Sequence, residues 1–197
     1  MAVKERTIDQ NVDLKKLGEF RSFLEDNPDK AKLHLRAKAI YGGQVGRSTV
    51  HIGPYAIDDE WVDRPTRHYT IPFGAWREVE DMIGVGGPTD RMEPVEMALA
   101  ATAACVINSI TFNTARMGID TEGLEITVDT IVDPRVLFAV KGPEAHPSCL
   151  GTINYEVKVT GDVSDQEMDT IQKLCAHSPV HGLMAEAINV SATVVRA

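Results

Sequence analysis

The amino-acid sequence predicts an α+β fold, because segments with strand periodicity and segments with helix periodicity follow one another in groups. Three segments with apolar residues at alternate positions precede a long apolar segment, residues 94–117. Two more strand-like segments, a helix-like segment and a final strand-like segment follow it. A chain of 197 residues is long enough to bury a core without disulfide bonds.

The N-terminal segment is predicted to form a helix outside the main sheet. Residues 11–25 carry apolar side chains at helical spacing, namely Leu14, Leu17 and Phe20. Asn27-Pro28-Asp29 then ends this helix. We therefore expect residues 1–30 to form a helical extension and residues 31–197 to form the main domain.

The next part of the chain predicts three strands and a loop. Residues 32–41 alternate between apolar and polar side chains, and the turn at Gly42-Gly43 predicts a hairpin with residues 46–53. Residues 66–73 predict a third strand. Residues 80–92 contain several glycines and predict a loop of the kind that often borders a functional site.

The segment from Pro94 to about Met117 predicts a long helix. Proline suits the first helical position, Glu96 suits the positive end of the helix, and Gly118 suits its stop. Apolar residues surround nearly the whole circumference. A helix of this kind is expected to be buried rather than to lie on the surface.

The C-terminal part predicts one more helix among strands. Ser164 and Glu167 form a capping-box pattern at the start of a helix over residues 165–177, and Ser178-Pro179 ends it. Three segments with alternating apolar residues predict strands: 124–132, 152–159 and 188–195.

The composition of the chain disfavours two classes of binding partner. The formal net charge is −9 and no cluster of Lys and Arg occurs, which disfavours nucleic acid and anionic membrane surfaces as partners. The N-terminus lacks an apolar signal core, and we expect no membrane-spanning segment. These features predict a cytoplasmic protein.

The three cysteines, Cys105, Cys149 and Cys175, are too few and too scattered to form a disulfide framework. None belongs to a CxxC pair, so a structural zinc site is not expected. His177 and His181 with Cys175 offer metal-ligand chemistry, but they straddle the predicted helix end, and a solvated helix end is the simpler interpretation.

Cys105 is the candidate nucleophile, although its own helix does not activate it. It lies eleven residues beyond Pro94, where the helix dipole no longer acts, and burial among alanines would raise its thiol pKa. A reactive thiolate therefore needs a cation from elsewhere in the fold, and the candidates are Arg36, Arg47 and Arg91. Otherwise Cys105 is a small core residue.

A resemblance to a known family favours the reactive alternative. Residues 94–105, PVEMALAATAAC, resemble the central-helix motif of the OsmC/Ohr family, in which an alanine-rich helix leads to a cysteine at this spacing. Ser178-Pro179-Val180 is similar to the family's second motif, and Gly86-Gly87-Pro88 is similar to its glycine loop. The resemblance extends over residues 31–197 in the order of the elements.

The resemblance implies an OsmC-like fold, with an antiparallel sheet packed on a long buried central helix, in an intertwined homodimer. It implies reduction of organic hydroperoxides or hydrogen peroxide by two cysteines, with an arginine–glutamate pair that holds the first as thiolate. By this likeness Cys105 is the nucleophile, Arg47 and Glu96 are its activators, and Cys175 is the second thiol. It implies neither a metal nor an organic cofactor, and it leaves the reductant unknown.

Three positions depart from the peroxidase pattern. Ser178 stands where the second cysteine is expected, Val95 stands where the glutamate is expected, and Gln44 follows the Gly-Gly pair where the arginine is expected. The alternatives are a non-peroxidase OsmC-like protein that binds a small ligand or handles sulfur species, and a dimeric scaffold in which Cys105 is inert.

Overall fold

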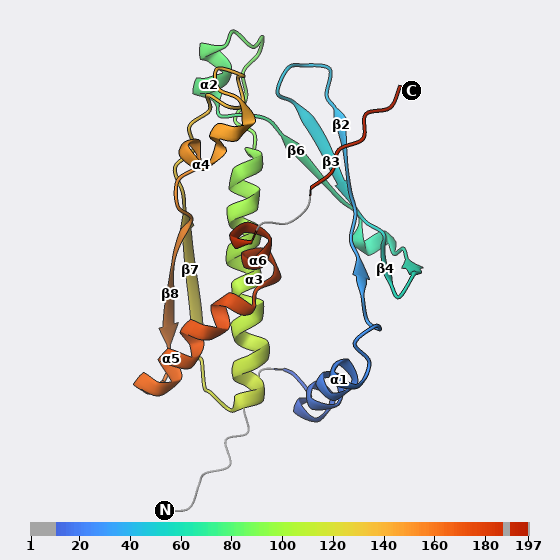
Figure 1. Cartoon of the computed structure of the whole chain (residues 1–197), viewed down its shortest axis with the longest axis vertical. Helices are drawn as coiled ribbons and strands as arrows, with labels where there is room; N and C mark the ends of the chain where they lie inside the picture. Colours follow the sequence, from blue (N-terminus) through green and yellow to red (C-terminus); the bar gives the residue numbers. More distant parts are fainter. Residues whose placement is uncertain (1–10, 187–189, 197) are drawn as a thin grey trace, which may run out of the picture. The chain divides into compact units, whose positions relative to one another are not determined.

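The computed structural model describes residues 11–186 and 190–196. They form two compact units, a first unit of residues 12–98 and a second unit from residue 99 onward (Figure 1). The first unit is built around a three-stranded sheet, and the second around a two-stranded sheet and helices.

Helix α1 (Leu14–Asp26) opens the first unit and confirms the predicted N-terminal helix. The Asp13 side chain caps it by accepting hydrogen bonds from the backbone N–H groups of Lys15 and Lys16, at 3.0 and 3.1 Å. None of its residues is buried.

The larger sheet of the first unit has the order β2-β3-β6, with all neighbours antiparallel. It confirms the hairpin across Gly42-Gly43 and the third strand. The bounds are β2 Ala37–Tyr41, β3 Ser48–Ile52 and β6 Tyr69–Phe73. Lys38 pairs with His51, and His51 pairs with Thr70, so these three side chains share one face of the sheet.

A second, smaller sheet in the first unit was not predicted. Its order is β1-β4-β5, from β1 (Leu33–His34), β4 (Tyr55–Ile57) and β5 (Glu60–Val62). The predicted strand over 32–41 is thus divided between two sheets. Short 3-10 helix η1 (Pro65–Arg67) precedes β6, and α2 (Arg77–Met82) occupies the start of the predicted glycine loop.

Helix α3 (Pro94–Met117) has the predicted bounds and enters the second unit at residue 99. Strands β7 (Gly123–Asp129) and β8 (Asn154–Thr160) pair antiparallel along their full lengths. Between them lie η2 (Pro143–Ala145) and α4 (His146–Cys149).

The last helices complete the second unit. Helix α5 (Asp165–Leu174) begins with the predicted capping box, in which both reciprocal bonds between Ser164 and Glu167 are present. It continues into η3 (Cys175–His177), and Ser178 then caps α6 (Pro179–Ala185), a helix that the sequence did not indicate.

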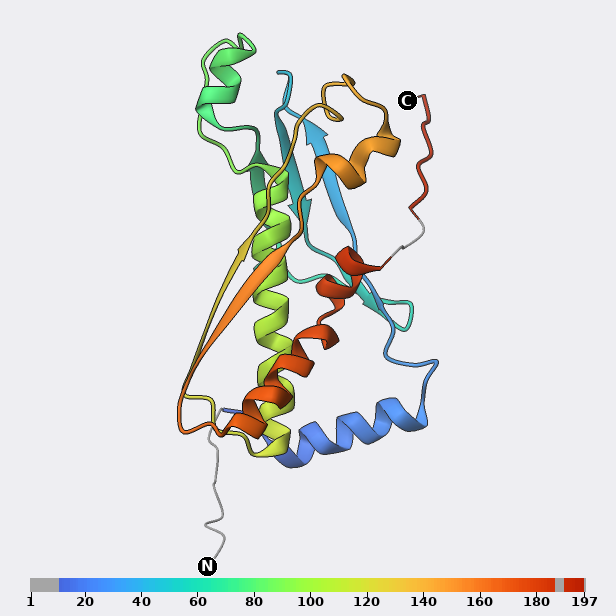
Figure 2. The same cartoon turned by 60° about the vertical axis from the view of Figure 1, so that its left-hand side comes forward.

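The core of the second unit lies between α3, α5 and the β7–β8 sheet (Figure 2). Its buried members are Val106, Ile110, Ile119, Ile171, Leu174 and Cys175. The inward face of the sheet packs against them through Leu124, Ile126, Tyr155, Val157 and Val159. The period of two along each strand explains why these residues share a face.

The described residues of a single chain cover one face of α3, so the burial expected around the whole helix stays a prediction for the assembled protein. Val106, Ile110 and Thr114 are buried, whereas Ala101, Ala104 and Asn108 are exposed and Phe112 is 58% exposed. By length and composition α3 could cross a membrane, and the expected absence of a membrane-spanning segment stays a prediction. The core helix of a soluble protein passes the same test, so length and composition decide nothing here.

The predicted strand over 188–195 does not form in the described residues 190–196, and residues 188 and 189 lie outside them. The alternating valines point into solvent, with Val190 94% and Val194 97% exposed. A strand needs a hydrogen-bonded neighbour, and this segment has none among the strands that the structure describes.

Candidate functional site

Arg47 lies at the end of the β2–β3 hairpin turn, immediately before β3. The turn needs glycine at positions 43 and 46, where φ is +80° and +75°. A hydrogen bond of 2.9 Å from the Gly42 N–H to the Arg47 carbonyl closes it. The Arg47 side chain is only 7% exposed, so its charge requires a partner.

That partner is Glu80 of α2, which is 2% exposed. Arg47 Nε donates to Glu80 Oε1 at 3.2 Å and Nη2 donates to Oε2 at 2.7 Å, a bidentate geometry that is among the strongest of ion pairs. The backbone N–H of Thr89 donates to the same Oε2 at 2.6 Å. The Arg47 and Thr89 bonds lower the pKa of Glu80 to about 2.

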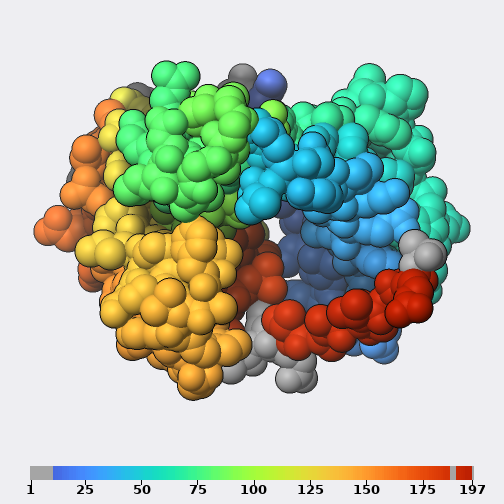
Figure 3. All heavy atoms as spheres, turned by 90° about the horizontal axis from the view of Figure 1, so that it is seen from above, coloured from blue at the N-terminus to red at the C-terminus, as the bar shows by residue number. Residues whose placement is uncertain are grey.

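The guanidinium also fixes the surrounding loops. Arg47 Nη2 donates to the carbonyl of Gly87 at 2.7 Å, and Nη1 donates to the side-chain oxygen of Gln44. These bonds join the hairpin turn to α2 and the glycine loop. In Figure 3 the cyan atoms of the hairpin turn lie against the green atoms of α2 and the loop. Together the Arg47 bonds use four of the five guanidinium N–H groups, so one N–H on Nη1 has no acceptor in the described part of the chain.

Glu96 does not pair with Arg47. It accepts a hydrogen bond of 3.1 Å from Trp76 Nε1 and one of 2.8 Å from the backbone N–H of Glu93, and these lower its pKa. It is exposed in the first turn of α3. The carboxylate that the structure brings to Arg47 is instead Glu80, which sequence reasoning missed because it lies in a segment predicted to be a loop.

The candidate thiols lie in the second unit. Cys105 is half-buried on α3, whereas Cys175 is 2% exposed on η3. Burial raises the pKa of the Cys175 thiol, and the neighbouring Tyr155 hydroxyl opposes that effect. Cys149 is a third free thiol and is also buried.

Ser178 and the nearby histidines have structural partners. The Ser178 hydroxyl accepts the His181 backbone N–H at 3.2 Å and so caps α6. The His181 ring bonds the Tyr155 hydroxyl through Nδ1 at 3.0 Å. Among the described residues, no group of three or more His, Cys, Asp and Glu side chains is placed to hold a metal ion.

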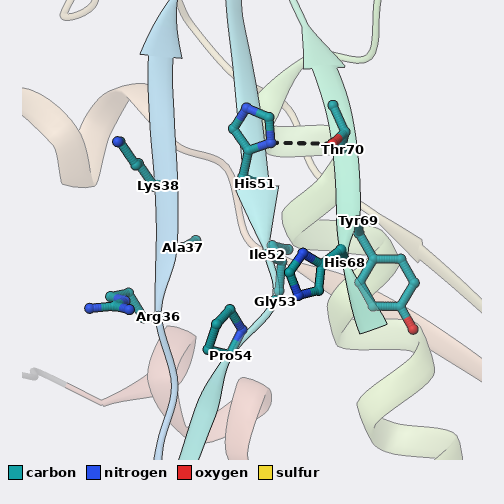
Figure 4. Close-up of a pocket in the computed structure, with 10 residues that line it drawn as sticks. All are labelled: Arg36, Ala37, Lys38, His51, Ile52, Gly53, Pro54, His68, Tyr69 and Thr70. Atoms are coloured by element: carbon teal, nitrogen blue, oxygen red, sulfur yellow. Dashed lines mark hydrogen bonds between the residues drawn. The ribbon is translucent and has the colours of Figure 1, made fainter. Parts of the chain in front are cut away.

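A pocket of about 580 Å³ lies on the β2–β3–β6 sheet of the first unit (Figure 4). Its charged lining comes from Arg36 and Lys38, the imidazoles of His51 and His68 also line it, and none of its ten lining residues is acidic. His51 Nδ1 lies 3.2 Å from the Thr70 hydroxyl, which fixes the orientation of the imidazole. Its size suits a small molecule, and its charge suits an anion.

We predict that Glu80→Gln lowers stability in a pH-dependent way. The folded-state pKa of Glu80 is depressed to about 2, so its ionised form stabilises the protein above the unfolded-state value of ~4.3 and loses that effect as pH falls toward about 2. Urea unfolding of wild type and variant should therefore differ most near neutral pH and converge in acid.

Glu78→Gln is the matched control, because Glu78 is an exposed glutamate on the same helix. It should leave the unfolding midpoint nearly unchanged at every pH. A constant difference between wild type and Glu80→Gln down to pH 2.5 would contradict the assignment.

Comparisons with known proteins identify the family. The family model described as OsmC-like protein matches residues 87–193, which is more than half of the chain. A search of curated proteins gave no match.

The search of solved structures found similar chains, and the one with a TM-score above 0.5 shows the same fold. An OsmC-like protein from Mycoplasma pneumoniae is 15% identical, with a TM-score of 0.54 over 82% of this chain and 97% of that chain. An organic hydroperoxide resistance protein OsmC from Legionella pneumophila is 18% identical, with a TM-score of 0.47 over 76% and 88% of the two chains. A putative osmotic stress induced and detoxification response protein from Psychrobacter arcticus is 15% identical, with a TM-score of 0.48 over 73% and 83%. The matched segment contains the whole of α3 and its cysteine, and this chain belongs to the OsmC-like protein family.

Proposed function

We propose that this protein is a thiol-dependent peroxide reductase in which Cys105 attacks the peroxide. The observation that carries the proposal is Cys105 itself, a half-buried free thiol on α3 within the segment that matches the family model. The thiolate attacks one oxygen of the peroxide, the O–O bond breaks, and Cys105 becomes a sulfenic acid. The departing alkoxide takes up a proton and leaves as an alcohol.

A thiolate at Cys105 requires a cationic hydrogen-bond donor, since the positive end of α3 is too distant to act. We propose that Arg47 supplies it through its remaining Nη1 hydrogen. The ion pair with Glu80 supports this role because it holds the guanidinium rigidly and keeps it charged. In this proposal Glu80 replaces Glu96 as the positioning carboxylate.

The second half of the cycle is assigned to Cys175. Its thiol displaces hydroxide from the Cys105 sulfenic acid and forms a disulfide, and an external thiol then reduces both cysteines. Both residues lie in the second unit, and Cys175 packs in the core cluster with Val106, the residue after Cys105. We assign the reductant only to a chemical class, the thiols.

We predict that reduced protein consumes cumene hydroperoxide and that Cys105→Ser lowers the rate by at least ~100-fold, as expected when a nucleophile is lost. A coupled peroxide assay with dithiothreitol as the reductant measures this. Cys149→Ser serves as the matched control, because it removes a buried thiol to which we assign no step. Equal rates for wild type and Cys105→Ser would contradict the proposal.

We further propose that the protein is a homodimer. Two observations support it: the apolar face of α3 that includes Phe112 is uncovered, and residues 190–196 carry the alternating pattern of a strand without a partner. A second copy of the chain would cover the apolar face of α3 and pair with the strand-like segment 190–196. An apolar face needs an apolar neighbour, and a strand needs another strand.

The dimer proposal predicts a mass near twice 21.5 kDa by light scattering, and a shift toward the monomer mass in Phe112→Glu. A glutamate at this apolar surface would be left charged and desolvated in the dimer. Phe138→Glu is the control, because Phe138 is similarly exposed on a loop. A monomeric wild type, or equal effects of both substitutions, would contradict the proposal.

A second candidate function is binding of a small organic anion, and the pocket on the β2–β3–β6 sheet favours it. Arg36 and Lys38 have no acidic partner within the described residues, although Arg36 stacks on the Trp61 ring at 4.7 Å. These two side chains present positive charge beside the imidazole of His51, in a protein whose net charge is −9.

This second candidate predicts binding of inorganic phosphate with a millimolar-range dissociation constant, as expected for a solvent-exposed site with two free cations. A titration with inorganic phosphate, monitored through the imidazole signals of His51 and His68, measures the dissociation constant. Lys38→Gln should weaken binding several-fold, whereas Lys30→Gln, an exposed lysine outside the pocket, should not. Signals that do not move with phosphate would exclude the site.

A further inference from the structure

Cys175 belongs to a polar cluster that the core of the second unit encloses. The Tyr155 ring packs against the buried cluster that contains Cys175, and its hydroxyl is close enough to the sulfur to oppose the rise in thiol pKa that burial causes. The same hydroxyl lies 3.0 Å from His181 Nδ1, and the two rings meet edge to face with centroids 5.9 Å apart. Three residues from η3, β8 and α6 thus form one chain of polar groups.

The three groups differ in their access to solvent. Cys175 is buried, whereas Tyr155 and His181 are half-buried. Burial also raises the pKa of Tyr155, so the phenol remains protonated near neutral pH. A protonated phenol bridges two groups well, because it accepts one hydrogen bond and donates another.

The hydrophobic cluster that contains Cys175 offers its proton no other acceptor side chain than Tyr155. From α3, α5 and β7 the cluster includes the apolar residues Val106, Ile110, Ile171, Leu174, Leu124 and Ile126. The sulfur also lies 3.4 Å from the carbonyl of Ile171, one helical turn earlier. That carbonyl can accept the thiol hydrogen but cannot remove it, whereas the Tyr155 hydroxyl can pass a proton onward.

We propose that Tyr155 and His181 form a proton relay that ionises the Cys175 thiol. The thiol proton moves to the Tyr155 oxygen while the Tyr155 proton moves to His181 Nδ1. The products are a thiolate, an unchanged phenol that now donates to sulfur, and an imidazolium. Atoms and charge balance, and no redox change occurs in this step.

The inference deepens the proposed function, because a buried second thiol needs a base. The Cys175 thiolate attacks the sulfur of the Cys105 sulfenic acid, the S–S bond forms, and hydroxide leaves. The proton held by His181 returns to that hydroxide through solvent and yields water. Tyr155 and His181 are positioning and proton-transfer residues in this scheme, and neither touches the peroxide.

The test measures Cys175 alone, in the full chain carrying Cys105→Ser and Cys149→Ser. Methyl methanethiosulfonate is a small neutral reagent that reacts with thiolates, and mass spectrometry gives its rate of addition between pH 5.5 and 8.5. We expect Tyr155→Phe and His181→Asn each to slow addition at pH 7 about tenfold, which corresponds to one unit of thiol pKa. Combining them should slow it no further, because both substitutions interrupt the same relay.

His177→Asn is the matched control, since His177 lies on η3 beside Cys175 but is exposed and outside the polar chain. In the His177→Asn variant, Cys175 should react with methyl methanethiosulfonate at the rate of the parent protein. In urea, Cys175 should react at the same rate in all variants. The inference is overturned if Tyr155→Phe and His181→Asn label as fast as the parent or faster, or if His177→Asn slows labelling as much. Near-ultraviolet circular dichroism checks the fold, and the two relay variants alter different elements, so each tests the relay separately.

The labelling experiment does not depend on peroxide turnover. A protein that fails to consume cumene hydroperoxide but shows relay-dependent labelling of Cys175 retains the inference and loses the proposed function. A protein that consumes peroxide while both relay variants label normally loses the inference alone.

Discussion

Helix α3 imposes the constraint on which the second unit depends, because its apolar side chains must leave water on more than one side. One face is satisfied within the chain, where Val106 and Ile110 meet the β7–β8 sheet and α5. Fully burying side chains of this size contributes roughly 1.5–3 kcal/mol each, enough to hold the sheet and helices together. Polar groups on the same face are also accommodated, since Ser109 donates to the Leu174 carbonyl at 2.7 Å. None of the residues that the structure describes covers the exposed face of α3 that includes Phe112, and this imbalance is the physical ground for the proposed dimer.

The first unit depends on a different kind of interaction, a buried ion pair. Removing Arg47 and Glu80 from water is unfavourable, and the structure offsets this with hydrogen bonds to both carboxylate oxygens and to nearly all guanidinium hydrogens. Apolar residues of similar size would fill the same space without that desolvation. This desolvation cost is one reason to propose a chemical role for the pair, in which the guanidinium serves a thiolate.

The comparison of sequence and structure separates local signals from long-range ones. The capping box at Ser164, the Gly42-Gly43 hairpin and the ends of α3 were predictable because each depends on residues close together in the chain. The partner of Arg47 was not, because Glu80 lies 33 residues away and its own neighbours do not reveal the pairing. The failed strand at 188–195 has the same cause, since its periodicity was correct but a strand forms only where another strand receives it.

The thiols illustrate how position decides chemistry among identical residues. Cys105 is half-buried, whereas burial of Cys175 raises the pKa of its thiol and shields it from solvent. A second thiol of this kind does not compete with the first for peroxide, but it then needs a route for its proton at the moment of disulfide formation. In the proposed relay, Tyr155 and His181 would provide that route without exposing the sulfur. On this proposal the serine at position 178 changes the geometry of the second thiol and does not remove the need for it, because Cys175 on the preceding turn would supply the thiol.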